Sequence, residues 1–171
     1  MPVVMSRVDE RLIHGQMALA WLKKYNVDCV IVIDDANAAD QLQTMLLQMA
    51  VSGSIECLVT SEADAKDLIQ SNMHKKLFLC AKLPGVFVRL LEQGVEIPHV
   101  NIGGIYNKPG RTQYFTTIFL DEPIKADILA LERFPDTKVE YRGAQRQRGG
   151  HHPGAEKEVR AIPHKSKQGR A

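Results

Sequence analysis

Short apolar runs alternate with segments of helical periodicity along most of this chain. Seven of the runs are rich in β-branched residues, and several are continuous rather than alternating, which is typical of strands covered on both faces. The predicted strands are Val3–Met5, Cys29–Ile33, Ile55–Thr60, Leu77–Cys80, Val100–Ile102, Thr117–Leu120 and Lys138–Tyr141. The last of them follows a helical segment, and we expect it at an edge of the sheet.

The segments between the strands carry helix signals. Gly15–Lys24 has its larger side chains at helical spacing, and Met45–Met49 is most simply the core-packed part of another helix. Polar residues, proline and glycine mark helix ends. The predicted boundaries are N-caps at Asn37, Ser61 and Asp121, a start at Pro84 for a helix over Val86–Glu92, and a stop at Gly94.

Repeated strand–helix–strand units indicate an α/β fold, because parallel strands need helical crossovers. We predict a single doubly wound domain with a mostly parallel central sheet of about seven strands, flanked by helices, in which one edge strand could run antiparallel. Ligands of such sheets bind beyond the carboxyl ends of the strands. This rule directs attention to the loop that follows the first strand.

Composition fits a globular protein with an ordinary core. The chain has 171 residues, 44% of them hydrophobic and 25% charged. Cys29, Cys57 and Cys80 form no CxxC motif and each lies in an apolar run, so we expect buried, reduced thiols. A signal peptide and a bilayer-spanning run are both missing from the pattern. We therefore expect a cytoplasmic protein, held at a membrane only through another chain.

Charge separates the chain into two parts. From Arg142 to the end there are eight Lys or Arg and two acids, a net charge of +6, whereas residues 1–141 have a net charge of −4. The terminal part is also rich in Gly and Pro and nearly empty of large apolar side chains. We predict a globular domain over residues 1–142 and a basic flexible tail over residues 143–171. His151 and His152 in the tail are weak evidence for a metal site.

The chemistry concentrates in Arg7–Gln16, which reads Arg-Val-Asp-Glu-Arg-Leu-Ile-His-Gly-Gln. A neutral imidazole such as that of His14 is a capable nucleophile near pH 7. Arg11 can hold phosphate oxygens with two parallel hydrogen bonds. Gly15 allows close approach of the backbone, and the helix beginning there directs free N–H groups at the same place. Asp9 could orient the imidazole or pair with Arg11. These residue types suit phosphoryl transfer, although a lone histidine at a helix start is more often structural.

Two other features are more ambiguous. Residues 104–112 approach the spacing of a nucleotide-binding P-loop but place Arg111 where lysine belongs and lead into a strand, so nucleotide binding is rejected. Lys108 and Arg111 could form a second basic wall near the phosphate or a partner, or lie in a solvated turn. Asp34 and Asp35 could line the same crevice or cap a helix.

The Arg7–Gln16 motif closely resembles the active-site loop of the IIB components of the mannose-type (mannose, fructose, sorbose, N-acetylgalactosamine) sugar phosphotransferase system. Further resemblances follow in order along residues 1–141. They are Val30–Asp35 with Ala38–Asp40, Gly94–Gly104 with its Gly-Gly turn, and the basic segment Lys108–Gln113.

The resemblance implies an enzyme that forms a phosphohistidine intermediate on His14, at Nδ1 in the family. The phosphoryl group would come from a IIA partner and pass to a sugar in the membrane subunits IIC and IID, with no cofactor, metal or nucleotide. Arg11 and the backbone at Gly15 and Gln16 match the positions around the phosphate. Arg7 and Asp9 match supporting positions and could equally anchor the loop.

Two alternatives remain beside the phosphotransferase. The first is a non-catalytic regulator or binding module that senses phosphate with the same loop. The second is a nucleic-acid-binding protein that uses the tail, which the acidic globular part disfavours, so we expect no nucleic-acid partner. The sequence leaves open the sugar, the oligomeric state (homo-oligomer included), and the role of the tail.

Overall fold

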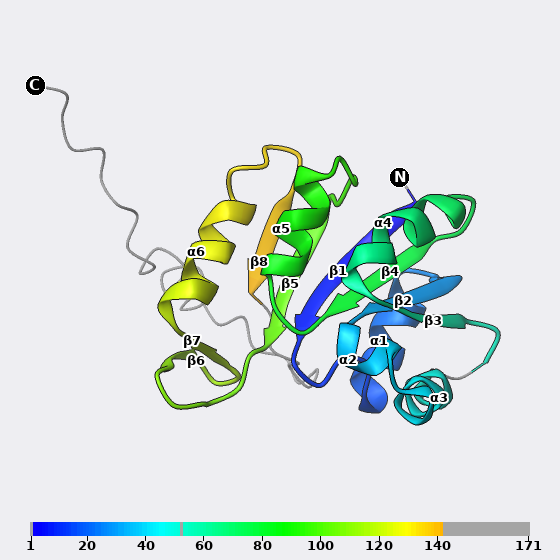
Figure 1. Cartoon of the computed structure of the whole chain (residues 1–171), viewed down its shortest axis with the longest axis horizontal. Helices are drawn as coiled ribbons and strands as arrows, with labels where there is room; N and C mark the ends of the chain where they lie inside the picture. The colour runs from blue at the N-terminus through cyan, green and yellow to red at the C-terminus, as the bar shows by residue number, and fades with distance from the viewer. Residues whose placement is uncertain (1, 52, 142–171) are drawn as a thin grey trace, which may run out of the picture.

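The computed structural model describes residues 2–51 and 53–141. Strands and helices alternate along this part of the chain (Figure 1). In chain order they are β1 (Val3–Asp9), α1 (Gly15–Lys24), β2 (Cys29–Ile33), α2 (Asp35–Ala38), α3 (Gln41–Ala50), β3 (Glu56–Thr60), α4 (Glu62–Ser71), β4 (Leu77–Ala81), α5 (Gly85–Glu92), β5 (His99–Gly104), β6 (Thr112–Phe115), β7 (Ile118–Leu120), α6 (Glu122–Leu131) and β8 (Lys138–Tyr141). The predicted tail, residues 143–171, lies outside the described residues.

A six-stranded parallel sheet forms the centre, in the order β3-β2-β4-β1-β5-β8. The α/β class and the parallel sheet are confirmed. The prediction that residues 117–120 belong to this sheet is wrong, because β8 occupies the free edge of β5. Instead β7 pairs antiparallel with β6 in a separate hairpin, joined to the end of β5 by one bridge between Ile105 and Ile118. The edge strand β8 itself runs parallel.

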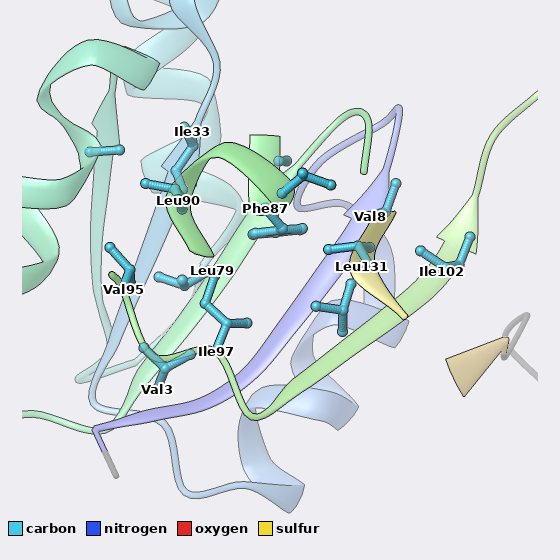
Figure 2. Packing of buried hydrophobic residues seen from close by; sticks show 14 of the residues in the cluster. Val3, Val8, Ile33, Leu79, Phe87, Leu90, Val95, Ile97, Ile102 and Leu131 are labelled. Atoms are coloured by element: carbon cyan, nitrogen blue, oxygen red, sulfur yellow. The ribbon is translucent and has the colours of Figure 1, made fainter. Parts of the chain in front are cut away.

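Helices cover both faces of the sheet. Alternate residues of each buried strand point to opposite sides: Ile31 and Ile33 join a core cluster with α4, α5 and α6, whereas Val30 and Val32 join a second cluster with α1 and α3. Figure 2 shows the first cluster, in which Phe87 and Leu90 of α5 lie among strand residues such as Leu79. This arrangement is the doubly wound packing that the continuous apolar runs predict.

Most predicted helix ends are confirmed. The side chains of Ser61 and Asp121 accept hydrogen bonds from N–H groups in the first turns of α4 and α6, and Gly94 follows α5 with a positive φ of 84°. The predicted cap at Asn37 is wrong, because Asn37 lies inside α2. Asp34 caps α2 and Asp40 caps α3, since both carboxylates come directly before their helices and accept first-turn N–H groups.

The prediction that Met45–Met49 packs in the core is wrong for most of its residues. Leu47 is buried, but Met45, Leu46 and Met49 are 51%, 50% and 77% exposed, and Leu42 one turn earlier is 63% exposed. The reason is position: α3 lies against the edge strand β3, so only the row of side chains containing Leu47 faces the sheet.

Three free cysteines, Cys29, Cys57 and Cys80, are buried as expected. Burial raises the pKa of Cys57 to about 11, and burial together with the nearby Glu56 raises that of Cys29 to the same value. Within residues 2–51 and 53–141, no helix is long and apolar enough to cross a membrane.

Sheet order determines where a binding crevice forms. From β1 the chain crosses to β2 and then to β3 in one direction, whereas from β5 it moves to β8 in the other. The loops that follow the adjacent strands β1 and β5 therefore diverge, which is the switch point at which α/β sheets bind ligands. The loop after β1 lies at the lower edge of the sheet in Figure 1, between the β6–β7 hairpin and α2.

Candidate active site

The end of β1 is held by a buried ion pair. Arg7 and Asp9, expected in the loop, belong to β1, because pairing with β4 and β5 continues through Asp9. Arg7 Nη2 donates to Asp9 Oδ2 at 2.9 Å, and Nη1 donates to Asn101 Oδ1 of β5 at 2.6 Å. Asp9 Oδ1 accepts the backbone N–H of Arg11 at 3.0 Å. These are the contacts of an anchor that connects the sheet to the start of the loop.

The Gly-Gly pair at the end of β5 makes room for this anchor. A Cβ atom at Gly103 would lie 2.2–2.4 Å from the guanidinium of Arg7, and one at Gly104 would lie 2.8 Å from Asp9 Oδ1. Buried charges need their partners at close range. Glycine at these two positions is therefore required by the close approach of the Arg7 and Asp9 side chains.

Beyond Glu10 the backbone turns sharply and re-enters the core. The N–H of Leu12 donates to Asp9 O at 2.8 Å, and Leu12 has a positive φ of 58°, which costs a non-glycine residue about 1 kcal/mol or more. The side chains of Leu12 and Ile13 are each only 4% exposed and pack with the α1–α3 cluster. Burying two apolar side chains offsets the strain and fixes the position at which His14 follows.

His14 is the N-cap residue of α1. Its backbone is extended (φ −153°, ψ 146°), and its side chain makes no cap hydrogen bond. The imidazole is half-buried, and its Nδ1 lies 3.4 Å from Leu12 O, a long contact. Gly15 begins the helix with a φ of 64°, and the first turn of α1 holds no acid. The free N–H groups at the start of this helix therefore face the site, and no acidic side chain in its first turn offsets their partial positive charge.

Arg11 precedes His14 in the loop between β1 and α1. Its side chain is exposed. Its Cζ is 4.3 Å from the centroid of the Tyr106 ring, which is a cation–π contact with the loop after β5. The sequence predicts that Arg11 binds phosphate, and an exposed guanidinium resting on an aromatic ring can do so. The side chain of Gln16 is not among those described.

Lys108 and Arg111 converge on Glu10. Glu10 Oε1 accepts from Lys108 Nζ at 2.7 Å and from Arg111 Nη1 at 2.9 Å, and Oε2 accepts the N–H of Tyr106 at 2.8 Å. Burial disfavours the charged form of Glu10, but these three hydrogen bonds outweigh burial and lower its pKa. Arg111 also lies 3.5 Å from Asp121. The proposed basic wall is therefore partly neutralised by acidic partners.

Asp34 and Asp35 both act at helix starts. Asp34 Oδ1 accepts the N–H of Asn37, while Asp34 Oδ2 pairs with Lys82 Nζ at 2.9 Å. Burial disfavours ionisation of Asp34, yet Lys82 and Asn37 lower the pKa of its carboxyl. Asp35 Oδ1 accepts the N–H of Glu62 at the start of α4. Lys82 follows β4, the strand beside β1, and so adds a cation at the same edge of the sheet.

Sequence reasoning missed four residues of this region: Glu10, Asn101, Tyr106 and Lys82. Glu10 stood in the motif without a role, and the Gly-Gly pair was expected only as a turn, whereas it forms the end of β5. Tyr106 and Lys82 carried no local signal, because their importance depends on pairing partners up to about a hundred residues away.

Comparison with known proteins gives one consistent result. Residues 3–146 match the family described as "PTS system sorbose subfamily IIB component". The N-acetylgalactosamine-specific phosphotransferase enzyme IIB component 2 of Escherichia coli K12 is 30% identical over 139 residues, covering 81% of this chain and 87% of that protein. The mannose-specific EIIAB component of the same organism is 33% identical over 124 residues, which cover 71% of this chain but only 38% of that longer protein.

A solved structure agrees with the sequence relatives. The IIBSor domain of the sorbose permease from Klebsiella pneumoniae superposes with a TM-score of 0.78 at 27% identity, covering 83% of this chain and 88% of that chain.

Proposed function

This chain belongs to the sorbose subfamily of phosphotransferase-system (PTS) IIB components, because residues 3–146 match that family, and we propose that His14 carries its phosphoryl group. Membership makes the chain a phosphocarrier of sugar uptake in the mannose, sorbose and N-acetylgalactosamine class, working through a phosphohistidine. The observation that supports His14 is its place: it caps α1 at the switch point, half-exposed, with no side-chain cap bond of its own.

Transfer to this chain exchanges one phosphorus–nitrogen bond for another. The lone pair of a His14 ring nitrogen attacks phosphorus as the bond to the donor histidine breaks, and the bonding pair returns to the donor imidazole. In the second step the oxygen of a sugar hydroxyl attacks the same phosphorus, and the phosphorus–nitrogen bond breaks with its electron pair returning to the His14 imidazole. The hydroxyl proton passes to water. Both steps need positioning and charge stabilisation more than covalent help from the protein.

The charge on the transferred group defines the roles of the neighbours. A phosphoryl group brings between one and two negative charges near pH 7. The first-turn N–H groups of α1, beginning at Gly15 and Gln16, and the guanidinium of Arg11 supply the compensating positive charge. Arg7 and Asp9 support the loop from within the sheet, and Lys108 and Arg111 lie on its other side, bound to Glu10.

The attacking atom is taken to be Nδ1, as in the family that the motif resembles. For Nδ1 to attack, the ring proton must lie on Nε2, so that Nδ1 has a free lone pair. The ring must also turn away from Leu12 O, and the 3.4 Å contact between Nδ1 and that oxygen is weak enough to allow this. Nitrogen-15 spectra of the phosphorylated protein distinguish the two ring nitrogens, and a signal from phosphorus on Nε2 would reject this assignment.

The family implies a IIA donor and IIC and IID permease partners. We propose that this chain receives its phosphoryl group from phospho-IIA and works in the cytoplasm at the inner face of the membrane, where IIC and IID present the sugar.

The test is phosphoryl transfer from a cascade charged with phosphoenolpyruvate. Wild-type protein should gain an acid-labile label, His14→Ala should gain none, and His74→Ala, which changes an exposed histidine on a different loop, should behave as wild type. Arg11→Ala should slow transfer about 10²–10³-fold, the usual cost of losing one preorganised charge partner. Absence of label on folded wild-type protein with a competent donor would favour the phosphate-sensing regulator instead.

A further inference from the structure

Glu10 lies where the loop after β1 meets the loop after β5. Its carboxylate is bound from three directions by the second loop: the N–H of Tyr106 at 2.8 Å, Lys108 Nζ at 2.7 Å and Arg111 Nη1 at 2.9 Å. Its own N–H donates to Gly104 O at 2.8 Å. The side chain is only 10% exposed, so Glu10 meets its own protein rather than a partner.

Tyr106 connects this carboxylate to Arg11. The backbone N–H of Tyr106 is held by Glu10, while its ring lies beneath the guanidinium of Arg11, with Cζ 4.3 Å from the ring centroid. Gly104 leaves the space for the ring, because a Cβ there would lie 2.8 Å from the Tyr106 hydroxyl oxygen. One residue, Tyr106, is therefore fixed by Glu10 at its backbone and supports Arg11 with its side chain.

Arg111 reinforces the same arrangement. Its guanidinium is 7% exposed, and Nη1 donates both to Glu10 Oε1 and to Tyr106 O at 2.8 Å. The backbone N–H of Tyr106 is thus bound by the Glu10 carboxylate, and its backbone carbonyl is bound by Arg111, the ion-pair partner of Glu10. Removing either partner of a buried ion pair is destabilising, because it leaves the other charge unpaired.

We infer that Glu10 is a positioning residue for phosphoryl transfer, which fixes Tyr106 and so presents the Arg11 guanidinium to the phosphoryl group on His14. The inference rests on the proposed function. Glu10 itself touches neither donor nor phosphate. Its role is to limit the rotamers of Arg11 before the donor arrives, so that less conformational freedom is lost in the transition state.

The test is the single-turnover rate of transfer from a phosphorylated IIA domain of this family, measured over a range of donor concentrations. Glu10→Gln and Tyr106→Leu should each lower the maximal rate about 2- to 5-fold, the range that a cation–π contact spans at an exposed site. The half-saturating donor concentration should stay unchanged, because Glu10 is buried. Tyr106→Phe keeps the aromatic face and should restore the rate relative to Tyr106→Leu.

Coupling to Arg11 separates positioning from general damage. In an Arg11→Ala background, Glu10→Gln should cause little further loss, since there is no guanidinium left to position. Glu56→Gln, which breaks the exposed pair with Lys75 at the other end of the sheet, is the matched control and should transfer as wild type.

Any of three results would overturn the inference while leaving the carrier intact. They are a wild-type rate for Glu10→Gln, a wild-type rate for Tyr106→Leu, and a loss in Glu10→Gln that is undiminished in the Arg11→Ala background. An unlabelled wild type would instead reject the proposed function, and the inference with it.

Discussion

Glu10 and Arg11 are neighbours in sequence, yet one side chain is buried in an ion-pair network and the other is exposed on an aromatic ring. Residue type alone suggested phosphate chemistry for Arg11 and left Glu10 without a role. The difference arises because Glu10 faces three donors that come from residues 106–111. Pairing over such a sequence distance depends on strand order, which local pattern does not contain.

The network around Glu10 should make stability depend on acid pH. Its pKa lies below the ordinary 4.5, so the folded state favours the ionised carboxyl. The stabilisation is complete above the ordinary value and is lost as pH falls through the lowered pKa. The difference in unfolding free energy between wild type and Glu10→Gln, from denaturant titrations between pH 7 and pH 3, should be constant near neutrality and shrink below 4.5.

Glu56→Gln provides the comparison for this measurement, because its partner Lys75 forms a more exposed pair. A wild-type to Glu10→Gln difference that stays the same across the whole range would mean that ionisation of Glu10 does not stabilise the fold.

Among the elements, α3 shows where sequence reasoning failed. Its apolar residues Met45, Leu46 and Met49 suggested core packing, but hydrophobic composition does not reveal how many neighbours cover a helix. Beside the edge strand β3, one row of side chains suffices, and only Leu47 of this helix is buried. Elements covered on both sides, such as β2 and β4, were identified correctly because their continuous apolar runs require burial on each face.

Paired substitutions in α3 test this assignment. Leu47→Ala should lower the unfolding free energy by about 2–4 kcal/mol, because it opens a cavity in the core. Met49→Ala, at a side chain that is 77% exposed, should change it by about 0.5 kcal/mol or less. Chemical denaturation of both variants gives the comparison, and equal losses would indicate that the outer face of α3 is covered in solution.

For the whole molecule, the α/β class and the parallel sheet followed from alternation of strand and helix patterns. The residue types of the loop after β1 suggested phosphoryl transfer, and the roles of its individual residues stay predictions. Sequence could not place residues 117–120, because a short apolar run is compatible with either a central sheet or a separate hairpin. The same limit applies to the loop after β5, whose contacts with Glu10 depend on β1 and β5 being adjacent.

The division into a domain over residues 1–142 and a tail over 143–171 remains a prediction. If the tail has no part in transfer, protein ending at residue 142 should unfold at the same denaturant concentration and accept phosphoryl groups at the same rate as the full chain. A lower rate for the truncated protein, with a difference from the full chain that disappears at high salt, would assign the tail's net charge of +5 a role in binding a partner.

The most direct test of the account is to locate the phosphoryl group. Tryptic peptide 12–23 contains His14 and no other histidine. After incubation with the charged cascade and digestion at neutral pH, mass spectrometry should find the added mass of one phosphoryl group on this peptide. The same mass on a peptide containing His74 or His99, with peptide 12–23 unmodified, would contradict the assignment of His14 as the carrier.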